Sequence, residues 1–105
     1  MARFDVYENP GVHEDTTPYL LDVQSDLLDG LDSRLVIPLR LADTFPKVTL
    51  PARLLPLFAV LGQPVLLETP KMAAVPRRIL RAPVASLAHE QAAITAALDF
   101  VFQGY

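Results

Sequence analysis

Short runs of alternating or clustered apolar residues fill most of the chain before residue 86. The stretch 3–7 alternates polar with apolar positions, which is typical of a half-buried strand. The tripeptides 9–11 and 62–64 contain glycine and proline and predict tight turns, and the polar stretch 24–32 predicts a loop. Similar apolar runs predict further strands at 19–23, 35–41, 48–50, 57–61 and 65–68.

The ten prolines limit helix length in this part of the chain, because proline breaks the interior of a helix. Short strands joined by turns are therefore favoured. Pro38 lies inside the predicted strand 35–41 and lacks the backbone N–H that a ladder needs. We expect it at a sheet edge or at a bulge.

From residue 86 onward, apolar residues recur at helical spacing and predict one C-terminal helix. Ser86 is a suitable N-cap, and Glu90 near the first turn suits the helix dipole. Gly104 stands where helices commonly end in a left-handed residue. The predicted apolar face consists of Leu87, Ile94, Leu98, Val101, Phe102 and Tyr105.

The aromatic residues of this helix cannot all share one face. Phe100 lies about 200° around the helix from Phe102. We expect Phe102 and Leu98 to pack inward, which leaves Phe100 and Tyr105 either at an interface or beneath a loop. The chain of 105 residues thus predicts a single domain over 1–105, mainly β, with a small barrel or curled sheet capped by one C-terminal helix.

Composition changes this picture in two ways. Hydrophobic residues make up 51% of the chain, and the mean hydropathy of +0.30 suggests apolar surface left over for a partner. The net charge of −3 argues against unassisted nucleic-acid binding. There is no cysteine, no apolar run of about 18 residues and no signal-like N-terminus, so we expect a cytoplasmic protein without a membrane partner.

Two acidic groups invite a metal-site interpretation. The tripeptide 13–15, His13-Glu14-Asp15, lies in a predicted loop, where a solvated surface is the favoured interpretation. The series Asp22, Asp26, Asp29 and Asp32 lacks the alternate spacing and the final glutamate of a calcium loop. Turn and cap roles are favoured for these aspartates, and we expect no metal ion and no cofactor.

Catalytic candidates are equally weak. His89, near the start of the last helix, has no hydroxyl nucleophile beside it by spacing, and a structural role is favoured. The basic group Arg77, Arg78 and Arg81 is interpreted as solvated surface, with an anion or acidic-partner site as the alternative. The residues therefore predict a binding protein and not an enzyme.

Several blocks, in order, resemble the CcdB family of toxins. They are Arg3-Phe4-Asp5-Val6-Tyr7, the stretch Leu21-Asp22-Val23-Gln24-Ser25-Asp26-Leu27-Leu28-Asp29, then Leu35-Val36-Ile37-Pro38-Leu39, Met72-Ala73-Ala74-Val75-Pro76, and the final aromatic helix. The resemblance implies an SH3-like β-barrel with a small extra sheet and a C-terminal helix, assembled as a two-fold homodimer.

The resemblance also implies a function. A CcdB toxin binds the A subunit of DNA gyrase and traps the enzyme on cleaved DNA. A CcdA-like antitoxin neutralises the toxin, and the two together repress their own operon, so DNA is contacted only indirectly through that complex. Carried over residue by residue, the gyrase-binding positions are Leu27, Leu28, Asp99, Gln103, Gly104 and Tyr105.

Two of these positions, Gln103 and Tyr105, depart from the family pattern. The family typically ends in Trp-Gly-Ile, with the tryptophan stacked on a gyrase arginine, whereas this chain ends in Gln103-Gly104-Tyr105. Glutamine has no π-face for a cation–π contact. The alternative is therefore a non-toxic or retargeted CcdB-like dimer that no longer poisons gyrase.

Overall fold

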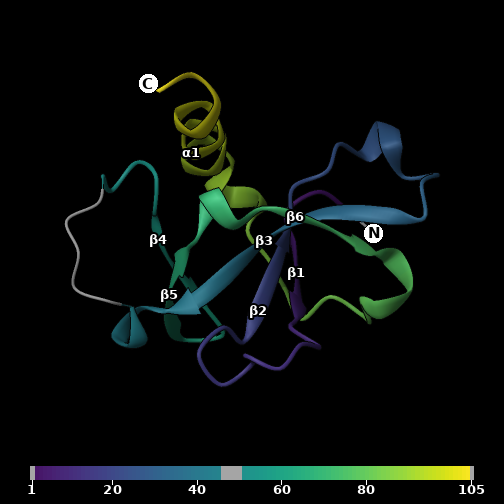
Figure 1. Cartoon of the computed structure of the whole chain (residues 1–105), viewed down its shortest axis with the longest axis horizontal. Helices are drawn as coiled ribbons and strands as arrows, with labels where there is room; N and C mark the ends of the chain where they lie inside the picture. The colour runs from purple at the N-terminus through teal and green to yellow at the C-terminus, as the bar shows by residue number, and fades with distance from the viewer. Residues whose placement is uncertain (1, 46–50, 105) are drawn as a thin grey trace.

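A strongly curved antiparallel sheet and one α-helix make up the fold (Figure 1). The computed structural model describes residues 2–45 and 51–104. The strands are β1 (Asp5–Glu8), β2 (Tyr19–Asp22), β3 (Ser33–Leu41), β4 (Leu57–Val60), β5 (Gln63–Leu67), β6 (Ala73–Pro76) and β7 (Ala85–Ser86). The helix α1 spans Gln91–Gln103, and the 3-10 turns are η1 (Asp26–Leu28), η2 (Ala42–Thr44), η3 (Thr69–Lys71), η4 (Arg77–Ile79) and η5 (Ala88–Glu90).

The long strand β3 organises the sheet. The strand order is β4-β5-β3-β2-β1-β7, and β6 also pairs with β3. The first half of β3 pairs with β6 and the second half with β5, so β6 belongs to the same nearly closed, barrel-like sheet as a branch along β3. The predicted fold, mainly β with one C-terminal helix, is confirmed.

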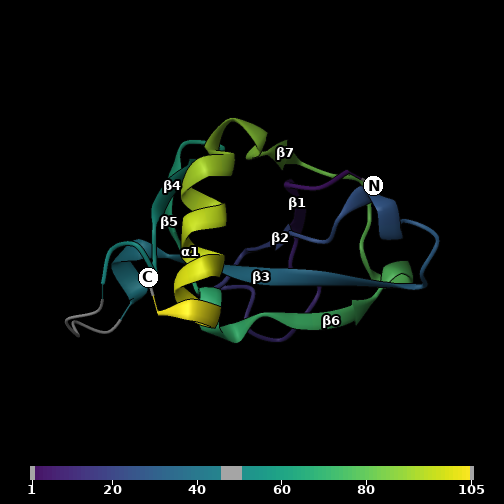
Figure 2. The ribbon, with the colours of Figure 1, turned by 90° about the horizontal axis from the view of Figure 1, so that it is seen from above.

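Two clusters of buried side chains hold the elements together. The main core lies inside the barrel and takes Ile94 and Ala97 from α1, which runs beside β4 and β5 (Figure 2). The smaller core contains Tyr7, Leu20, Val36 and Leu80, and β6 and η4 pack against it through Val75 and Ile79. In residues 2–45 and 51–104, no helix is long and apolar enough to cross a lipid bilayer.

The predicted strands fall close to the observed ones, with two qualifications. The predicted strand 48–50 lies outside the described residues. The short strands β6 and β7 were not predicted, because their sequences are rich in alanine and proline and carry little alternation.

Pro38 does not lie at a sheet edge, since β3 has a paired strand on both sides. It lies where the outer partner of β3 changes from β6 to β5. There its carbonyl accepts a hydrogen bond from the N–H of Glu68 at 3.0 Å. The missing N–H of proline therefore falls at a gap between two ladders, where no partner strand needs it.

The turn expected over 62–64 is in fact centred on Leu61 and Gly62. Both residues have positive φ, +50° and +81° respectively, and Val60 pairs with Gln63. This is the geometry of a two-residue hairpin turn whose twist matches that of the flanking strands. Gln63 and Pro64 already belong to β5.

The start of α1 differs from the prediction, whereas its end agrees with it. Ser86 lies in β7, and its Oγ accepts from the N–H of Ala88, the first residue of η5, at 3.2 Å; the N-cap position of α1 is held by Glu90 instead. Gly104 has φ +81°, and its N–H donates to the carbonyl of Phe100 at 2.9 Å. The left-handed C-terminal glycine is therefore confirmed.

The inward placement of Phe102 is wrong, because its side chain is 71% exposed. The buried stripe of α1 runs through Ile94 and Ala97, and Phe102 lies about 140° around the helix from Ala97. Leu98 does pack against the core, as expected. Phe100 is partly buried, with the Arg53 guanidinium 5.8 Å from its ring centre.

Candidate functional site

A short turn after β2 presents leucine side chains to solvent. Ser25 begins it, because its Oγ accepts from the N–H of Leu27 at 3.2 Å and its carbonyl accepts from Leu28 at 3.0 Å. Leu27 is 95% exposed, and Leu28 and Leu31 are about half exposed. We call residues 25–31 the leucine turn.

Gln24 ties the leucine turn to the start of β3. Its amide Nε2 donates to the carbonyl of Leu28 at 3.0 Å, and its Oε1 accepts from the N–H of Leu35 at 3.0 Å. The residue itself is buried. One buried side chain therefore fixes Leu28 of the turn relative to Leu35 of β3.

Beneath the leucine turn lies a buried ion pair between β2 and β3. The side chains of Asp22 and Arg34 are both fully buried. Asp22 Oδ2 accepts a hydrogen bond from Arg34 Nε at 2.8 Å and lies 2.7 Å from Nη2 in an ion pair, and Asp22 Oδ1 accepts from the N–H of Gln24 at 3.0 Å. One carboxylate oxygen thus faces a charged donor and the other a neutral one, and a buried carboxylate requires such partners.

Two further carboxylates extend the ion pair to the surface. Arg34 Nη1 lies 3.2 Å from Asp29 Oδ1, and Nη2 lies 3.9 Å from Asp26 Oδ1. Asp26 also accepts from the N–H of Arg3 at 2.8 Å. Arg77 lies 3.6 Å from the Asp29 carboxylate and donates to the carbonyl of the same residue.

The acidic series was therefore interpreted incompletely from the sequence. Besides their local roles, Asp22, Asp26 and Asp29 converge on Arg34, which no spacing rule links to them. Asp32 contributes only its backbone carbonyl, which accepts from the N–H of Arg77 at 2.8 Å. Leu31 is a further apolar residue of this surface that the sequence did not predict, and its place between Gly30 and Asp32 in a polar loop is the signal that points to it.

Burial dominates the electrostatics of this region. It raises the pKa of Asp22 above its usual value, although the hydrogen bonds from Arg34 and Gln24 act in the opposite direction. Nearby on β1, burial raises the pKa of Tyr7 to about 12, with a smaller contribution from the negative charges of Asp5 and Asp22. Within the described residues the Tyr7 hydroxyl has no hydrogen-bond partner.

The other predicted contact residues lie at the end of α1. Asp99, Gln103 and Gly104 are exposed there, next to Phe102, and Tyr105 lies outside the described residues. The leucine turn and this helix end lie toward opposite ends of the molecule (Figure 2). One chain therefore does not bring the two halves of the predicted surface together.

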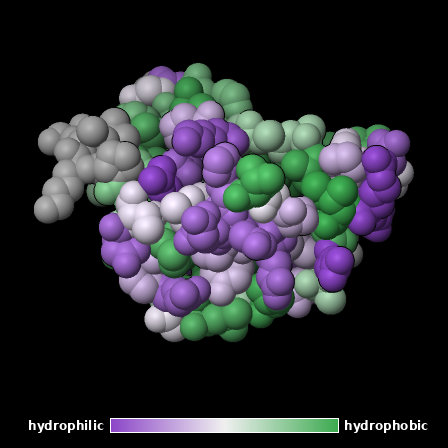
Figure 3. Space-filling view, turned by 60° about the horizontal axis from the view of Figure 1, so that its bottom comes forward, coloured by the Kyte–Doolittle hydropathy of each residue, from purple (hydrophilic) through white to green (hydrophobic). Residues whose placement is uncertain are grey.

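The remaining candidates lie apart from these two regions. His13, Glu14 and Asp15 are exposed in the loop between β1 and β2, and His89 is exposed in η5. Across residues 2–45 and 51–104, no group of three or more His, Cys, Asp or Glu side chains is placed to hold a metal ion. Hydrophilic side chains gather over much of the face seen in Figure 3, with one apolar group among them near the middle and others toward the edges.

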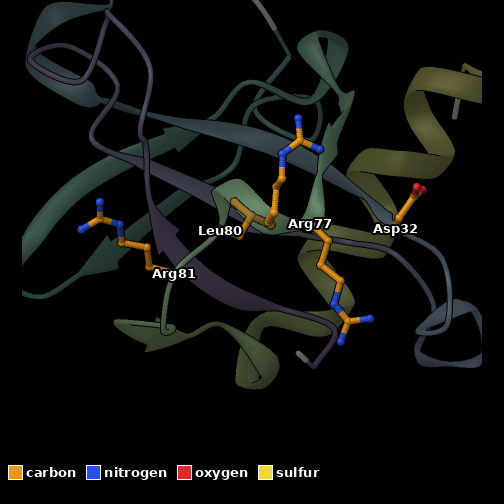
Figure 4. A pocket seen from close by; sticks show the side chains of 5 residues that line it. Asp32, Arg77, Leu80 and Arg81 are labelled. Atoms are coloured by element: carbon orange, nitrogen blue, oxygen red, sulfur yellow. The ribbon is translucent and has the colours of Figure 1, made fainter.

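The arginine group lines a shallow cavity of about 560 Å³ together with Asp32 and Leu80. Arg77 and Arg81 point away from each other there (Figure 4). Arg78 and Arg81 are exposed, whereas Arg77 is partly buried through its contacts with Asp29. The favoured interpretation as solvated surface thus fits Arg78 and Arg81 better than Arg77.

Comparison with known proteins assigns the chain to a protein family. No curated protein matched the chain. The family model described as CcdB protein matches residues 3–104, which include both the leucine turn and the end of α1. That family consists of toxins that act by binding and not of enzymes. The chain therefore belongs to the CcdB family and is a toxin of the CcdB toxin–antitoxin type.

Proposed function

We propose that this protein binds the A subunit of DNA gyrase and traps the gyrase–DNA cleavage complex. The observation that supports this most strongly is the 95% exposure of Leu27 on a turn that is hydrogen-bonded on both flanks. A single exposed leucine would not indicate a binding site, because such residues are common on protein surfaces. Here, however, Leu28 and Leu31 accompany it on the same leucine turn, so an apolar group is held in place for a partner.

The size of the contact is adequate for recognition. Full burial of a leucine side chain stabilises a complex by about 1.5–3 kcal/mol. Leu27 has nearly its whole side chain available, and Leu28 about half. Together they would form the apolar centre of an interface whose polar rim is supplied by exposed Asp26 and Ser25.

The end of α1 supplies the second part of the surface. Gln103 occupies the position of the family's tryptophan and offers no ring. Phe102, one position earlier, is 71% exposed and presents an aromatic face at the same helix end. Phe102 is therefore our candidate for the aromatic contact to gyrase, beside Asp99 and Gly104.

The proposal includes assembly and regulation. A two-fold homodimer would supply each half of the surface twice, and two-fold dimers are the commonest soluble assemblies. A CcdA-like antitoxin would cover the toxin in the cytoplasm, and the pair would repress its own operon. The net charge of −3 supports contact with DNA through the antitoxin and not through this chain.

The experiment combines growth, binding and cleavage. Expression of the chain alone should arrest growth, and the purified protein should bind the gyrase A subunit and accumulate cleaved DNA with the complete enzyme. Leu27→Ser should weaken binding at least tenfold. Val12→Ser is the matched control, because Val12 is 89% exposed on a different loop and should leave binding unchanged. Normal growth at high expression, together with no gyrase binding, would overturn the proposal.

Gln103 favours the second candidate, a CcdB-like dimer that has lost or changed its target. That candidate predicts dimerisation and antitoxin binding without measurable binding to gyrase. Deletion of residues 103–105 separates the two candidates further. The deletion should abolish growth arrest without unfolding the protein if gyrase is the target, and should change nothing in growth if it is not.

A further inference from the structure

We propose that Arg34 is a positioning residue that holds the leucine turn in its partner-binding conformation. The proposal deepens the proposed function and rests on the leucine turn being the gyrase contact. It begins from a contrast in exposure. Arg34 has a side chain that is fully buried, and it lies beneath a turn whose Leu27 is 95% exposed.

The guanidinium group links three points of the chain at once. Its Nε and Nη2 contact Asp22 at the end of β2, and Nη1 contacts Asp29 just after η1. Asp26, the first residue of η1, lies 3.9 Å away. Because the guanidinium is planar and rigid, its fork fixes the spacing between both ends of the turn.

Stability alone is a weak reason for this arrangement. A buried ion pair often adds no more stability than apolar residues of similar volume, because removing two charges from water is costly. Apolar residues would not hold the carboxylates of Asp26 and Asp29 in fixed positions. The arrangement therefore fits a role in fixing one conformation of the leucine turn.

Backbone hydrogen bonds within the leucine turn complete this arrangement. The N–H groups of Leu28, Asp29 and Leu31 donate within the turn to Ser25, Asp26 and Leu28 respectively. All three bonds lie at the surface, where water competes with them. The Arg34 contact to Asp29 holds the second of these donors close to the barrel, so its loss should loosen the turn and not the core.

Asp29→Asn is the test, since Asp29 is about half exposed and its replacement leaves Asp22 paired with Arg34. We expect at least tenfold weaker binding to the gyrase A subunit and faster amide exchange at Leu28 and Leu31. Amides of β2 and β3 should exchange as in the unmodified protein. Asp43→Asn, an exposed aspartate in η2, is the matched control and should change neither quantity.

A double-mutant cycle tests whether Asp29 acts through Leu27. If it does, Asp29→Asn combined with Leu27→Ser binds no more than twofold weaker than Leu27→Ser alone. Fully additive losses would overturn the proposal, because they would mean that Asp29 touches gyrase by itself.

Failure of the proposed function has a different signature. If the unmodified protein does not bind gyrase, the gyrase assignment fails, and the amide-exchange comparison still tests the positioning role. Exchange at Leu28 and Leu31 that is unchanged in Asp29→Asn would overturn the positioning proposal whatever the partner is.

Discussion

Replacing Asp22 by asparagine tests the buried ion pair beneath the leucine turn. The carboxylate accepts one hydrogen bond from Arg34 Nε at 2.8 Å, lies 2.7 Å from Arg34 Nη2, and accepts one hydrogen bond from the N–H of Gln24 at 3.0 Å. Asparagine has nearly the same size as aspartate. The substitution therefore removes the negative charge without opening a cavity, and leaves a buried guanidinium short of its main partner.

The size of the effect follows from what remains around Arg34. Removing one member of a buried pair destabilises a protein by about 3–5 kcal/mol. Arg34 would keep Asp29 at 3.2 Å and Asp26 at 3.9 Å, so we expect the lower end, about 3 kcal/mol. In a domain of this size each 1 kcal/mol shifts Tm by about 4–8 °C, so Tm should fall by at least about 12 °C.

Thermal and urea unfolding, followed by circular dichroism, measure this loss. Protein concentration is held fixed, because self-association would make Tm depend on it. Asp29→Asn is the control and should cost less than about 1 kcal/mol, since its ion pairs reach the surface. Asp22→Asn combined with Arg34→Met should recover part of the stability, because no charge then stays buried. An Asp22→Asn protein as stable as the Asp29→Asn control would refute the reasoning.

Four further predictions concern three residues. Tyr7→Phe should stabilise the protein by about 1 kcal/mol in urea unfolding, because the buried hydroxyl has no partner in the described residues, and a lower stability would contradict this. Since the pKa of Tyr7 rises from 10.0 to about 12, unmodified protein should lose roughly 1.4 kcal/mol per pH unit between these values, and Tyr7→Phe should lose less. Leu61→Asn should raise stability by roughly 0.5–1 kcal/mol, because φ at Leu61 is +50° and asparagine tolerates this region better; an unchanged Tm would count against it. Phe102→Ser should change stability by less than about 0.5 kcal/mol yet weaken gyrase binding at least tenfold, as measured by calorimetry, whereas unchanged binding would remove Phe102 from the contact surface.

The local pattern of the sequence predicted much of the fold. Alternation located β1 and apolar runs located β2, β3, β4 and β5 to within a few residues, and helical spacing located α1. Gly104 ended the helix as expected, because only glycine adopts a left-handed conformation without strain. These features depend on residues that are close in the chain, so a local pattern can reveal them.

The candidate site was predicted only in part. The exposure of Leu27 and Leu28 agrees with the contact role that the family resemblance implied, although no observation yet tests that role. The exposure of Phe102 was missed because the buried stripe of α1 is completed by Ala97, whose small side chain gives a weak hydrophobic signal. The sheet, and not the helix alone, decides which face of α1 is covered.

The sequence by itself therefore determined which local features the chain contains. These are short strands, one final helix, an apolar pair in a polar loop and a series of aspartates. Only the tertiary structure decided that Arg34, on β3, turns inward and meets Asp22, Asp26 and Asp29 beneath that pair. The physical reason is that a charge can be buried only where several chain segments supply its partners together. Such a meeting is set by the pairing of β2 with β3, at a distance along the chain that no local pattern records.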